Sequence, residues 1–172
     1  MKATLELINQ MQADGVIGEY AIGGAVGATF YLAPAATADL DLFVTLPEST
    51  GLLVVLSPIY EYLKSRGCRE QDEYIVVGDW PVQFLPLRNA LHEEAMNQAI
   101  ATNVEGVPTR VISAEHLVAI ALETGRAKDY ARILQFLEQG AVDREKLKDI
   151  LERHGLSKRW NQFEHRFLKG SQ

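Results

Sequence analysis

The chain reads DLDLFV from residue 39 to residue 44, so that Asp39 and Asp41 alternate with large aliphatic residues. Alternation with a period of two predicts a β-strand. Residues i and i+2 of a strand point to the same face and lie roughly 6–7 Å apart, so the two carboxylates are expected side by side. The aliphatic neighbours indicate a central, buried strand, in which two like charges lose hydration and repel each other. Something positive must therefore offset Asp39 and Asp41.

A divalent cation would offset these two carboxylates directly. Proteins bind Mg²⁺ through one or two carboxylates, and the ion keeps several waters and bridges to substrate phosphates. We therefore expect Asp39 and Asp41 to be catalytic residues that hold Mg²⁺, with Mn²⁺ as the alternative ion. The alternative is that both are solvated residues at a strand edge. Strand interiors rarely hold two unpaired acids, which favours the metal site.

A second segment, AIGGA at residues 21–25, follows a short apolar strand expected at residues 20–22. Gly23 and Gly24 allow the backbone to turn sharply and to approach a ligand closely. Backbone N–H groups in such a turn, leading into a helix, hold phosphate oxygens well. A Gly-Gly pair alone is usually only a turn. Together with the aspartates that follow, it predicts a site for a nucleoside triphosphate and its metal ion.

The combined pattern is an apolar residue, two glycines, a small residue, a loop, and then Asp-apolar-Asp. It resembles the signature of the nucleotidyltransferase superfamily, which includes DNA polymerase beta, aminoglycoside nucleotidyltransferases, minimal nucleotidyltransferases and AbiEii-type toxins of bacterial abortive-infection systems. The resemblance is strongest over residues 18–45. The later segments SAEHL (113–117) and GRAKD (125–129) are similar to the corresponding region of AbiEii-type proteins, where a helix ends in a basic residue followed by Lys-Asp. The resemblance implies a polymerase-beta-like fold.

The resemblance also implies roles for particular residues. Ala25 stands where the family's glycine motif usually ends in Ser, and we expect it to lie beside the nucleotide with Gly23 and Gly24. Arg126, Lys128 and Asp129 would bind nucleotide, with Lys128 on the phosphates and Asp129 ordering Lys128 or serving as a base. Adjacent helix residues do not face each other, so both reach one cleft only where a helix begins at its edge. The alternative is a solvated charge cluster at a helix end.

The family usually supplies a third carboxylate from a following strand, and here Gln83 stands at that position, in PVQFL at residues 81–85. An amide oxygen can ligate a metal ion, but it carries no charge and is a poor base. We therefore expect Gln83 to be the third metal ligand, with an exposed strand residue as the alternative. Gln83 and Ala25 weaken the expectation of turnover without removing that of nucleotide binding.

Two functions remain open from the sequence. The first is an enzyme that binds a nucleoside triphosphate with Mg²⁺ and transfers a nucleoside monophosphate to a hydroxyl acceptor, which is a small molecule, a protein side chain or an RNA end. The second is a catalytically degenerate module that binds a nucleotide or a partner protein, as one half of a toxin–antitoxin pair. The intact Asp39-Leu40-Asp41 favours the first, and Gln83 favours the second.

Composition limits the class of protein. The chain has 172 residues, of which 47% are apolar and 23% charged, as in ordinary globular proteins. The formal net charge of −6 gives no broad basic face, so DNA is not an expected partner. A single cysteine, Cys68, allows no internal disulfide. Because no apolar run reaches membrane-spanning length, we expect a cytoplasmic protein that does not enter a membrane.

The distribution of patterns predicts the organisation of the chain. Strand and helix patterns alternate up to residue 112, and only helical patterns follow, with helix starts at Ser113, Asp143 and Ser157. We expect an α+β protein: a nucleotidyltransferase-like α/β core at 1–112, with a mixed sheet flanked by helices, and a helical bundle at 113–172. The expected strands cover 20–22, 39–44, 74–77 and 82–87, with a hairpin at 104–111; the expected helices of the core cover 2–14, 25–32, 51–65 and 88–98.

Overall fold

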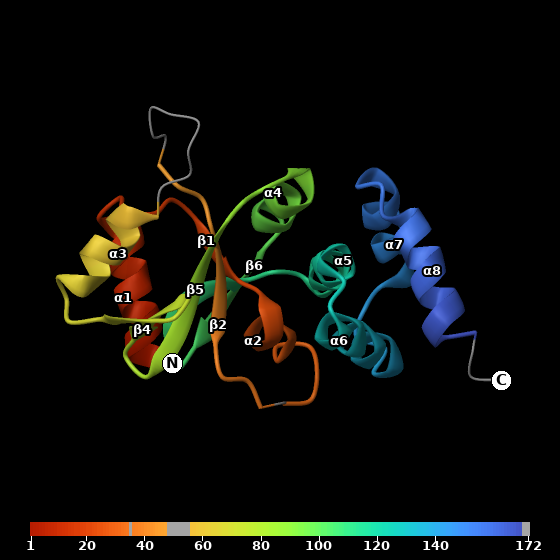
Figure 1. The fold of residues 1–172 in the computed structure, drawn as a ribbon, viewed down its shortest axis with the longest axis horizontal. Coiled ribbons are helices and arrows are strands. Elements are labelled where there is room, and N and C mark those ends of the chain that lie inside the picture. The colour runs from red at the N-terminus through yellow and green to blue at the C-terminus, as the bar shows by residue number, and fades with distance from the viewer. Residues whose placement is uncertain (35, 48–55, 170–172) are drawn as a thin grey trace.

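The computed structural model describes residues 1–34, 36–47 and 56–169, which form one mixed sheet with helices on both faces and further helices towards the C-terminus (Figure 1). In chain order, the helices and strands are α1 (Lys2–Ala13), β1 (Tyr20–Ile22), α2 (Gly24–Ala28), β2 (Leu40–Val44), α3 (Ser57–Lys64), β3 (Arg69–Gln71), β4 (Tyr74–Val77), β5 (Trp80–Pro86), α4 (Ala90–Asn97), β6 (Ile100–Val104), β7 (Val107–Val111), α5 (Ala114–Thr124), α6 (Ala127–Glu138), α7 (Arg144–Arg153) and α8 (Ser157–Phe167).

The sheet has seven strands in the order β3-β4-β5-β2-β1-β7-β6. Strand β2 is central: it pairs antiparallel with β1 on one side and parallel with β5 on the other. Strand β7 runs parallel to β1, so the sheet contains both parallel and antiparallel pairs, as the sequence predicts. In the β2–β5 pair, Asp41 lies opposite Gln83. The register therefore sets these two side chains next to each other on one face of the sheet.

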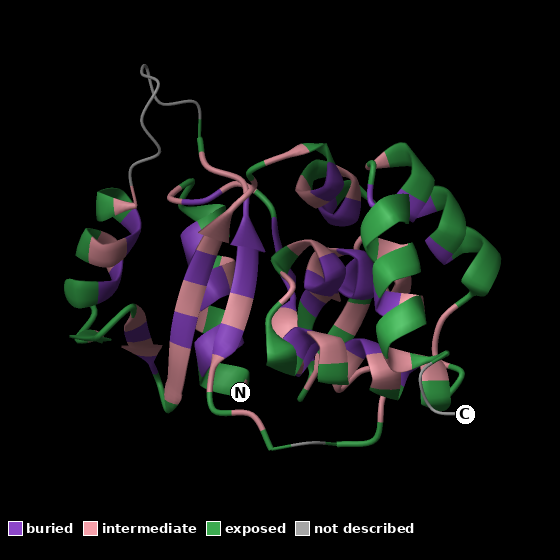
Figure 2. Ribbon diagram, turned by 45° about the vertical axis from the view of Figure 1, so that its right-hand side comes forward, coloured by how far each residue is buried: buried purple, intermediate pink, exposed green. Residues whose placement is uncertain are grey.

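One face of the sheet packs against α1 and α3. Leu40, Leu42 and Val44 of β2 are fully buried on this face, together with Leu5 of α1 and Leu63 of α3. Each such aliphatic side chain contributes about 1.5–3 kcal/mol when removed from water. Figure 2 shows the alternation along the central strands, where buried and half-buried residues succeed each other. The predicted aliphatic side of the strand is thus confirmed, and Asp39 and Asp41 belong to the opposite side.

The second face of the sheet packs against α2, α4 and the C-terminal helices. Ala21 of β1 and Phe43 of β2 share one buried cluster with Leu117 of α5, Phe136 of α6 and Phe163 of α8. The predicted helical region after residue 112 is confirmed (Figure 1). Its core is continuous with this face of the sheet, which brings α5 and α6 close to the acidic side of β2.

Most predicted elements are present, with shifted ends. Helix α2 stops at Ala28, because the N–H groups of residues 29–31 bond three residues back and form turns instead of a helix. Strand β5 begins at Trp80, two residues before the predicted start. Pro81 is tolerated there because β2 begins opposite Val82, so Pro81 has a paired neighbour only on the β4 side.

Two strands go beyond the prediction. Strand β3 is not expected from the sequence, and the first arm of the hairpin around Glu105 and Gly106 is longer than predicted, since it begins at Ile100. The helix predicted at 51–65 is present as α3, while residues 51–55 lie outside the described residues. Among the residues that the structure describes, no helix is long and apolar enough to cross a membrane.

Candidate active site

Strand β2 carries the two aspartates into a cavity between the sheet and the helices of its second face. Asp39 immediately precedes β2, Asp41 lies within it, and both side chains are half-buried. A cavity of about 510 Å³, hereafter the large cavity, is lined by Asp39, Asp41 and Gln83 among others. The structure therefore brings together the three residues that the sequence nominates as metal ligands.

Gly24 is placed where no other residue fits. Its φ of 56° is in the left-handed region, which side chains disfavour. A Cβ atom built on Gly24 would overlap the Oδ2 atom of Asp41. The backbone of the glycine turn therefore lies directly against the carboxylate of Asp41, as expected for a site in which both touch one ligand.

Gly23 joins the glycine turn to β2. Its N–H group donates to the backbone carbonyl of Asp41 at 2.9 Å, so it is already occupied. A Cβ atom on Gly23 would also meet the ring of Phe43 at 2.5 Å. Gly23 thus ties the start of α2 to β2, whereas the N–H groups of Gly24 and Ala25 lie in the first helical turn and lack intrahelical acceptors.

Three cationic side chains face the aspartates from α6 and its N-cap. Arg126, Lys128 and Arg132 line a second, smaller cavity of about 100 Å³ together with Gly24, Ala25, Asp39, Asp41 and Asp129. We call it the small cavity. Residues separated by more than eighty positions in the chain therefore meet at one place, because α5 and α6 pack on the same face of the sheet as the aspartates.

The cations near Asp41 do not fully compensate the burial of its carboxylate. Burial, and then the neighbouring Asp39 carboxylate, raise the pKa of Asp41 above its usual value. Arg132, Lys128 and Arg126 act in the opposite direction but do not reverse the shift. Burial thus disfavours the ionised form of Asp41 more than the nearby cations favour it, and a bound cation would stabilise the ionised form.

The set of donors fits a Mg²⁺ ion. Asp39 and Asp41 offer carboxylate oxygens and Gln83 an amide oxygen, which are the hard oxygen ligands that Mg²⁺ binds alongside waters. Glu73 lines the same cavity, yet no group of three or more His, Cys, Asp or Glu side chains suited to a metal ion occurs in the part of the chain that the structure describes. The third metal ligand that the sequence predicts is therefore an amide, that of Gln83, and not a carboxylate.

Asp129 is bonded within its own helix rather than to Lys128. It is 2% exposed and accepts hydrogen bonds from the backbone N of Arg126 at 3.1 Å and from its Nε at 2.7 Å. Arg132 approaches its other oxygen at 3.7 Å. In the described ranges, no hydrogen bond or ion pair joins Asp129 to Lys128. Asp129 thus holds two arginines, a role that the sequence does not anticipate.

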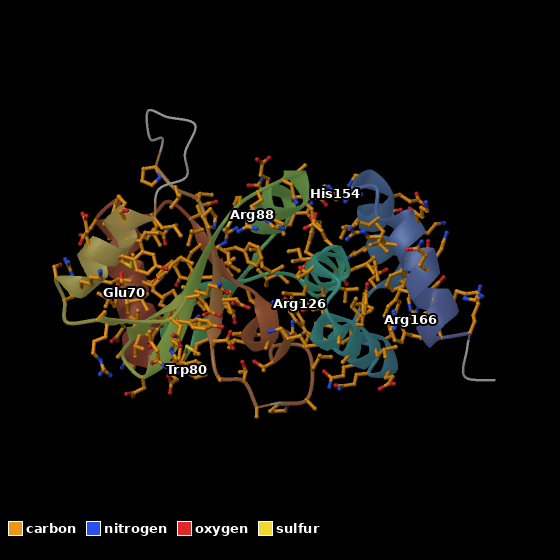
Figure 3. All side chains as sticks on the ribbon, in the orientation of Figure 1. Glu70, Trp80, Arg88, Arg126, His154 and Arg166 are labelled. Atoms are coloured by element: carbon orange, nitrogen blue, oxygen red, sulfur yellow. The ribbon has the colours of Figure 1, made fainter. Side chains whose placement is uncertain are left out.

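The large cavity also contains residues that the sequence does not single out. Arg88, from the connection between β5 and α4, lines it together with Arg126, which the resemblance already assigns to the nucleotide; Figure 3 labels both. His92 lies there as well, with its Nε2 atom 3.1 Å from Oε2 of Glu123. Near the aspartates, burial and the Asp39 carboxylate raise the pKa of Tyr74. No short motif marks Arg88, His92, Glu123 and Tyr74, because they come from separate parts of the chain.

Known proteins resemble this chain in structure. No family model and no curated protein sequence matches it. The solution structure of the antibiotic-resistance factor ANT(2'')-Ia is 17% identical and covers 96% of both chains, with a TM-score of 0.55. A crystal structure of ANT(2'')-Ia in complex with adenylyl-2''-tobramycin is 16% identical, with a TM-score of 0.52, over 91% of this chain and 98% of that one.

A third solved structure is also similar. It is the crystal structure of an antigenic nucleotidyltransferase-like protein from Paracoccidioides brasiliensis, 14% identical over 92% of both chains, with a TM-score of 0.56. All three similarities extend over nearly the whole chain. They show that the chain has the nucleotidyltransferase fold, which confirms the fold expected from the glycine and aspartate segments. The nearer likeness to AbiEii-type proteins stays a prediction.

Proposed function

We propose that this chain, which has the nucleotidyltransferase fold, binds a nucleoside triphosphate with Mg²⁺ and transfers its nucleoside monophosphate to a hydroxyl acceptor. One observation carries the proposal. The carboxylates of Asp39 and Asp41 share a small cavity with the cations of α6, and the backbone of Gly24 lies against Asp41. Paired acids, cations and free backbone N–H groups in one place fit a metal-bound polyphosphate.

Each residue has a distinct part in this proposal. Asp39, Asp41 and Gln83 would hold Mg²⁺, which when bound neutralises phosphate charge and polarises the phosphoryl group. The N–H groups of Gly24 and Ala25 donate to phosphate oxygens, as first-turn donors do at anion sites.

Cations from α6 complete the phosphate site. Lys128 supplies a mobile positive charge beside the phosphates, and Arg126, which lines the same cavity, adds a second charge.

The reaction is a displacement at the α-phosphorus. The acceptor hydroxyl forms a new P–O bond there, the bond to the bridging oxygen breaks, and pyrophosphate leaves with the bonding electrons. The hydroxyl proton passes to a carboxylate of the pair or to water. Because such chemistry depends mainly on positioning and charge neutralisation, the chain needs few reactive groups. The acceptor occupies the large cavity, and the crystal structure of ANT(2'')-Ia in complex with adenylyl-2''-tobramycin supports a small molecule as the acceptor.

Calorimetry tests the binding step. Wild-type protein is titrated with each nucleoside triphosphate in Mg²⁺, beside the double variant Asp39→Asn, Asp41→Asn. The variant is expected to lose binding, since it keeps the shape of both side chains and removes their charge. A matched control neutralises two exposed acids of α7, with Glu145→Gln and Asp149→Asn, and is expected to bind like wild type. Absence of binding to wild type, or equal binding to the Asp39 and Asp41 variant, would refute the metal–nucleotide site.

Transfer of label tests the chemistry. Nucleotide labelled at the α-phosphate is incubated with Mg²⁺ and with candidate acceptors, namely small hydroxyl compounds, protein and RNA ends. Label is expected in an acceptor with wild type and not with the Asp39 and Asp41 double variant. Label that persists with the double variant would show that other residues carry the reaction.

A non-catalytic role is the second candidate, and one observation favours it. The residue opposite Asp41 is Gln83, and the described residues offer no third carboxylate in its place. On this alternative the chain binds nucleotide or a partner protein, for example as half of a toxin–antitoxin pair. Nucleotide binding that depends on Asp39 and Asp41, without transfer to any acceptor, would favour it over the enzyme.

A further inference from the structure

Three residues of the α6 region follow each other at intervals of three. Arg126, Asp129 and Arg132 therefore lie along one side of the helix, with the acid between two arginines. This side lines the small cavity, because all three residues border it. The arrangement differs from a solvated row of charges, since the central acid is only 2% exposed.

The buried carboxylate of Asp129 restricts the positions of the arginine side chains that contact it. Taking Asp129 out of water is unfavourable unless cations and hydrogen bonds compensate it. Arg126 provides three of these contacts: its backbone N at 3.1 Å, Nε at 2.7 Å and a terminal nitrogen at 3.3 Å. Arg132 provides the remaining charge at 3.7 Å. The position of each guanidinium group is thereby tied to Asp129.

The two arginines differ in how enclosed they are. The side chain of Arg126 is 58% exposed, whereas that of Arg132 is 19% exposed. A guanidinium group has five N–H donors. Across the described part of the chain, the structure shows no hydrogen bond from the guanidinium of Arg132, whose contact with Asp129 exceeds hydrogen-bond length. Arg132 thus presents enclosed donors to a cavity that also contains Asp41 and Gly24.

We infer that Arg132 contacts the phosphates of a bound polyphosphate and that Asp129 is a positioning residue that holds Arg132 and Arg126 for this contact. The inference rests on the proposed function for the identity of the ligand as a nucleotide. A guanidinium group suits this role because its planar donors match two phosphate oxygens at once. Lys128 then adds a single mobile charge, and Asp129 takes no proton from the acceptor.

The ligand series AMP, ADP, ATP and inorganic tripolyphosphate tests the contact by calorimetry in Mg²⁺. The variants are Arg132→Gln and Arg132→Lys, and Arg144→Gln on α7 is the control for the loss of one positive charge. Arg132→Gln is expected to weaken ATP and tripolyphosphate binding about 10- to 100-fold, as for the loss of a charged hydrogen-bonded contact. The loss of affinity caused by Arg132→Gln should be largest for ATP, smaller for ADP and smallest for AMP. Arg132→Lys should recover part of the affinity, and Arg144→Gln should match wild type.

Asp129→Asn tests the positioning role. The amide keeps the size of the side chain and removes the charge that holds the arginines. ATP affinity is expected to fall, again more than AMP affinity, and Arg132→Gln should cost little further affinity in this background. A purely structural role would lower the melting temperature while leaving the ratio of ATP to AMP affinity unchanged, and that result would overturn the positioning role.

The outcomes separate this inference from the proposed function. Equal ATP and tripolyphosphate binding by wild type and Arg132→Gln would overturn the inference and leave the proposed function standing. Tripolyphosphate binding that depends on Arg132, without transfer of nucleotide to any acceptor, would support the inference and count against the enzyme. Absence of binding of any polyphosphate to wild type would overturn both.

Discussion

The candidate site depends on the absence of a side chain at Gly24. Its φ of 56° and its contact with Asp41 both exclude a Cβ atom. Gly24→Ala should therefore add backbone strain of about 1–2 kcal/mol and also push the Asp41 carboxylate out of place. We expect a lower melting temperature together with loss of Mg²⁺-dependent nucleotide binding, measured by thermal unfolding and calorimetry.

Gly140 offers a matched control for the strain alone. Its φ of 62° is similar, but nothing lies within 4 Å of an added Cβ atom. Gly140→Ala should lower the melting temperature and leave nucleotide binding unchanged. If both variants lose stability equally and both keep binding, the close approach of Gly24 to Asp41 has no part in the site.

Gln83 is the position at which a single substitution could restore the third carboxylate that the family usually has. Because Gln83 lies opposite Asp41, Gln83→Asp would place a third carboxylate beside Asp39 and Asp41. Without metal, the added charge should lower the melting temperature by repulsion. With Mg²⁺, the variant should be stabilised more than wild type, since a ligand that binds only the folded state raises its stability.

Thermal unfolding with and without Mg²⁺ measures this difference, and the transfer assay shows whether activity rises as well. Gln71→Asp on the exposed edge strand β3 is the control, and Mg²⁺ should affect it as it affects wild type. An equal response to Mg²⁺ in wild type and Gln83→Asp would show that residue 83 does not reach the ion.

At the scale of elements, an acid of α4 links three helices. Glu94 accepts a hydrogen bond from Arg153 of α7 at 2.6 Å and lies 3.1 Å from Nε2 of His116 of α5. The adjacent His154 approaches its other oxygen at 2.8 Å. His116 itself is 1% exposed and lies 2.7 Å from the hydroxyl of Ser113. Glu94 therefore joins the helix that follows β5 to the C-terminal helices.

This linkage makes a prediction about acid stability. Hydrogen bonds from Arg153, His154 and His116 lower the pKa of Glu94 from its ordinary value of 4.5 to about 2, despite partial burial. A lowered folded-state pKa contributes stability above pH 4.5, which is lost as the pH falls towards 2. The difference in unfolding free energy between wild type and Glu94→Gln should thus shrink between pH 4.5 and 2. Glu93→Gln, at the exposed neighbouring acid, is the control, and an equal trend in that variant would show that the loss does not come from the contacts of Glu94.

Periodicity predicts the elements that have one apolar side, and it misses those that do not. The alternation at 39–44 identifies β2 because the aliphatic residues pack on α1 and α3. Strand β3 is missed because Arg69–Gln71 are all exposed at the sheet edge, where no packing shapes the sequence. Ser113 and Asp143 mark helix starts correctly because their side chains accept from backbone N–H groups of the first turn.

The sequence predicts the parts of the site whose residues are close together in the chain. Asp39 and Asp41 share a strand, so their proximity follows from strand geometry alone. Their approach to Arg126 and Lys128 follows only from the resemblance, since it depends on how α6 packs on the sheet. Arg132 could have been found from its spacing of three from Asp129. The sequence does not predict that Asp129 binds Arg126 instead of Lys128. This pairing is evident only from the burial and the hydrogen bonds of Asp129 in the folded chain.

At the scale of the whole molecule, the sheet separates two buried clusters. The cluster on the α1 and α3 face is built from the first part of the chain. The cluster on the other face combines Ala21 and Phe43 of the sheet with residues of α4 to α8. Removal of residues 113–172 would expose this second face, so the boundary predicted at residue 112 divides one shared core.

A shared core predicts one cooperative unfolding transition. The chain has two tryptophans, Trp80 on β5 and Trp160 on α8, which report on the sheet and on the C-terminal helices separately. In the variants Trp80→Phe and Trp160→Phe, the remaining tryptophan follows unfolding in urea by fluorescence. Because the helices cover a sheet face that would otherwise meet water, both probes should give the same midpoint, and circular dichroism should agree with them. An earlier midpoint for Trp160 than for Trp80 would show that the helical region unfolds by itself, and that residues 1–112 remain folded without it.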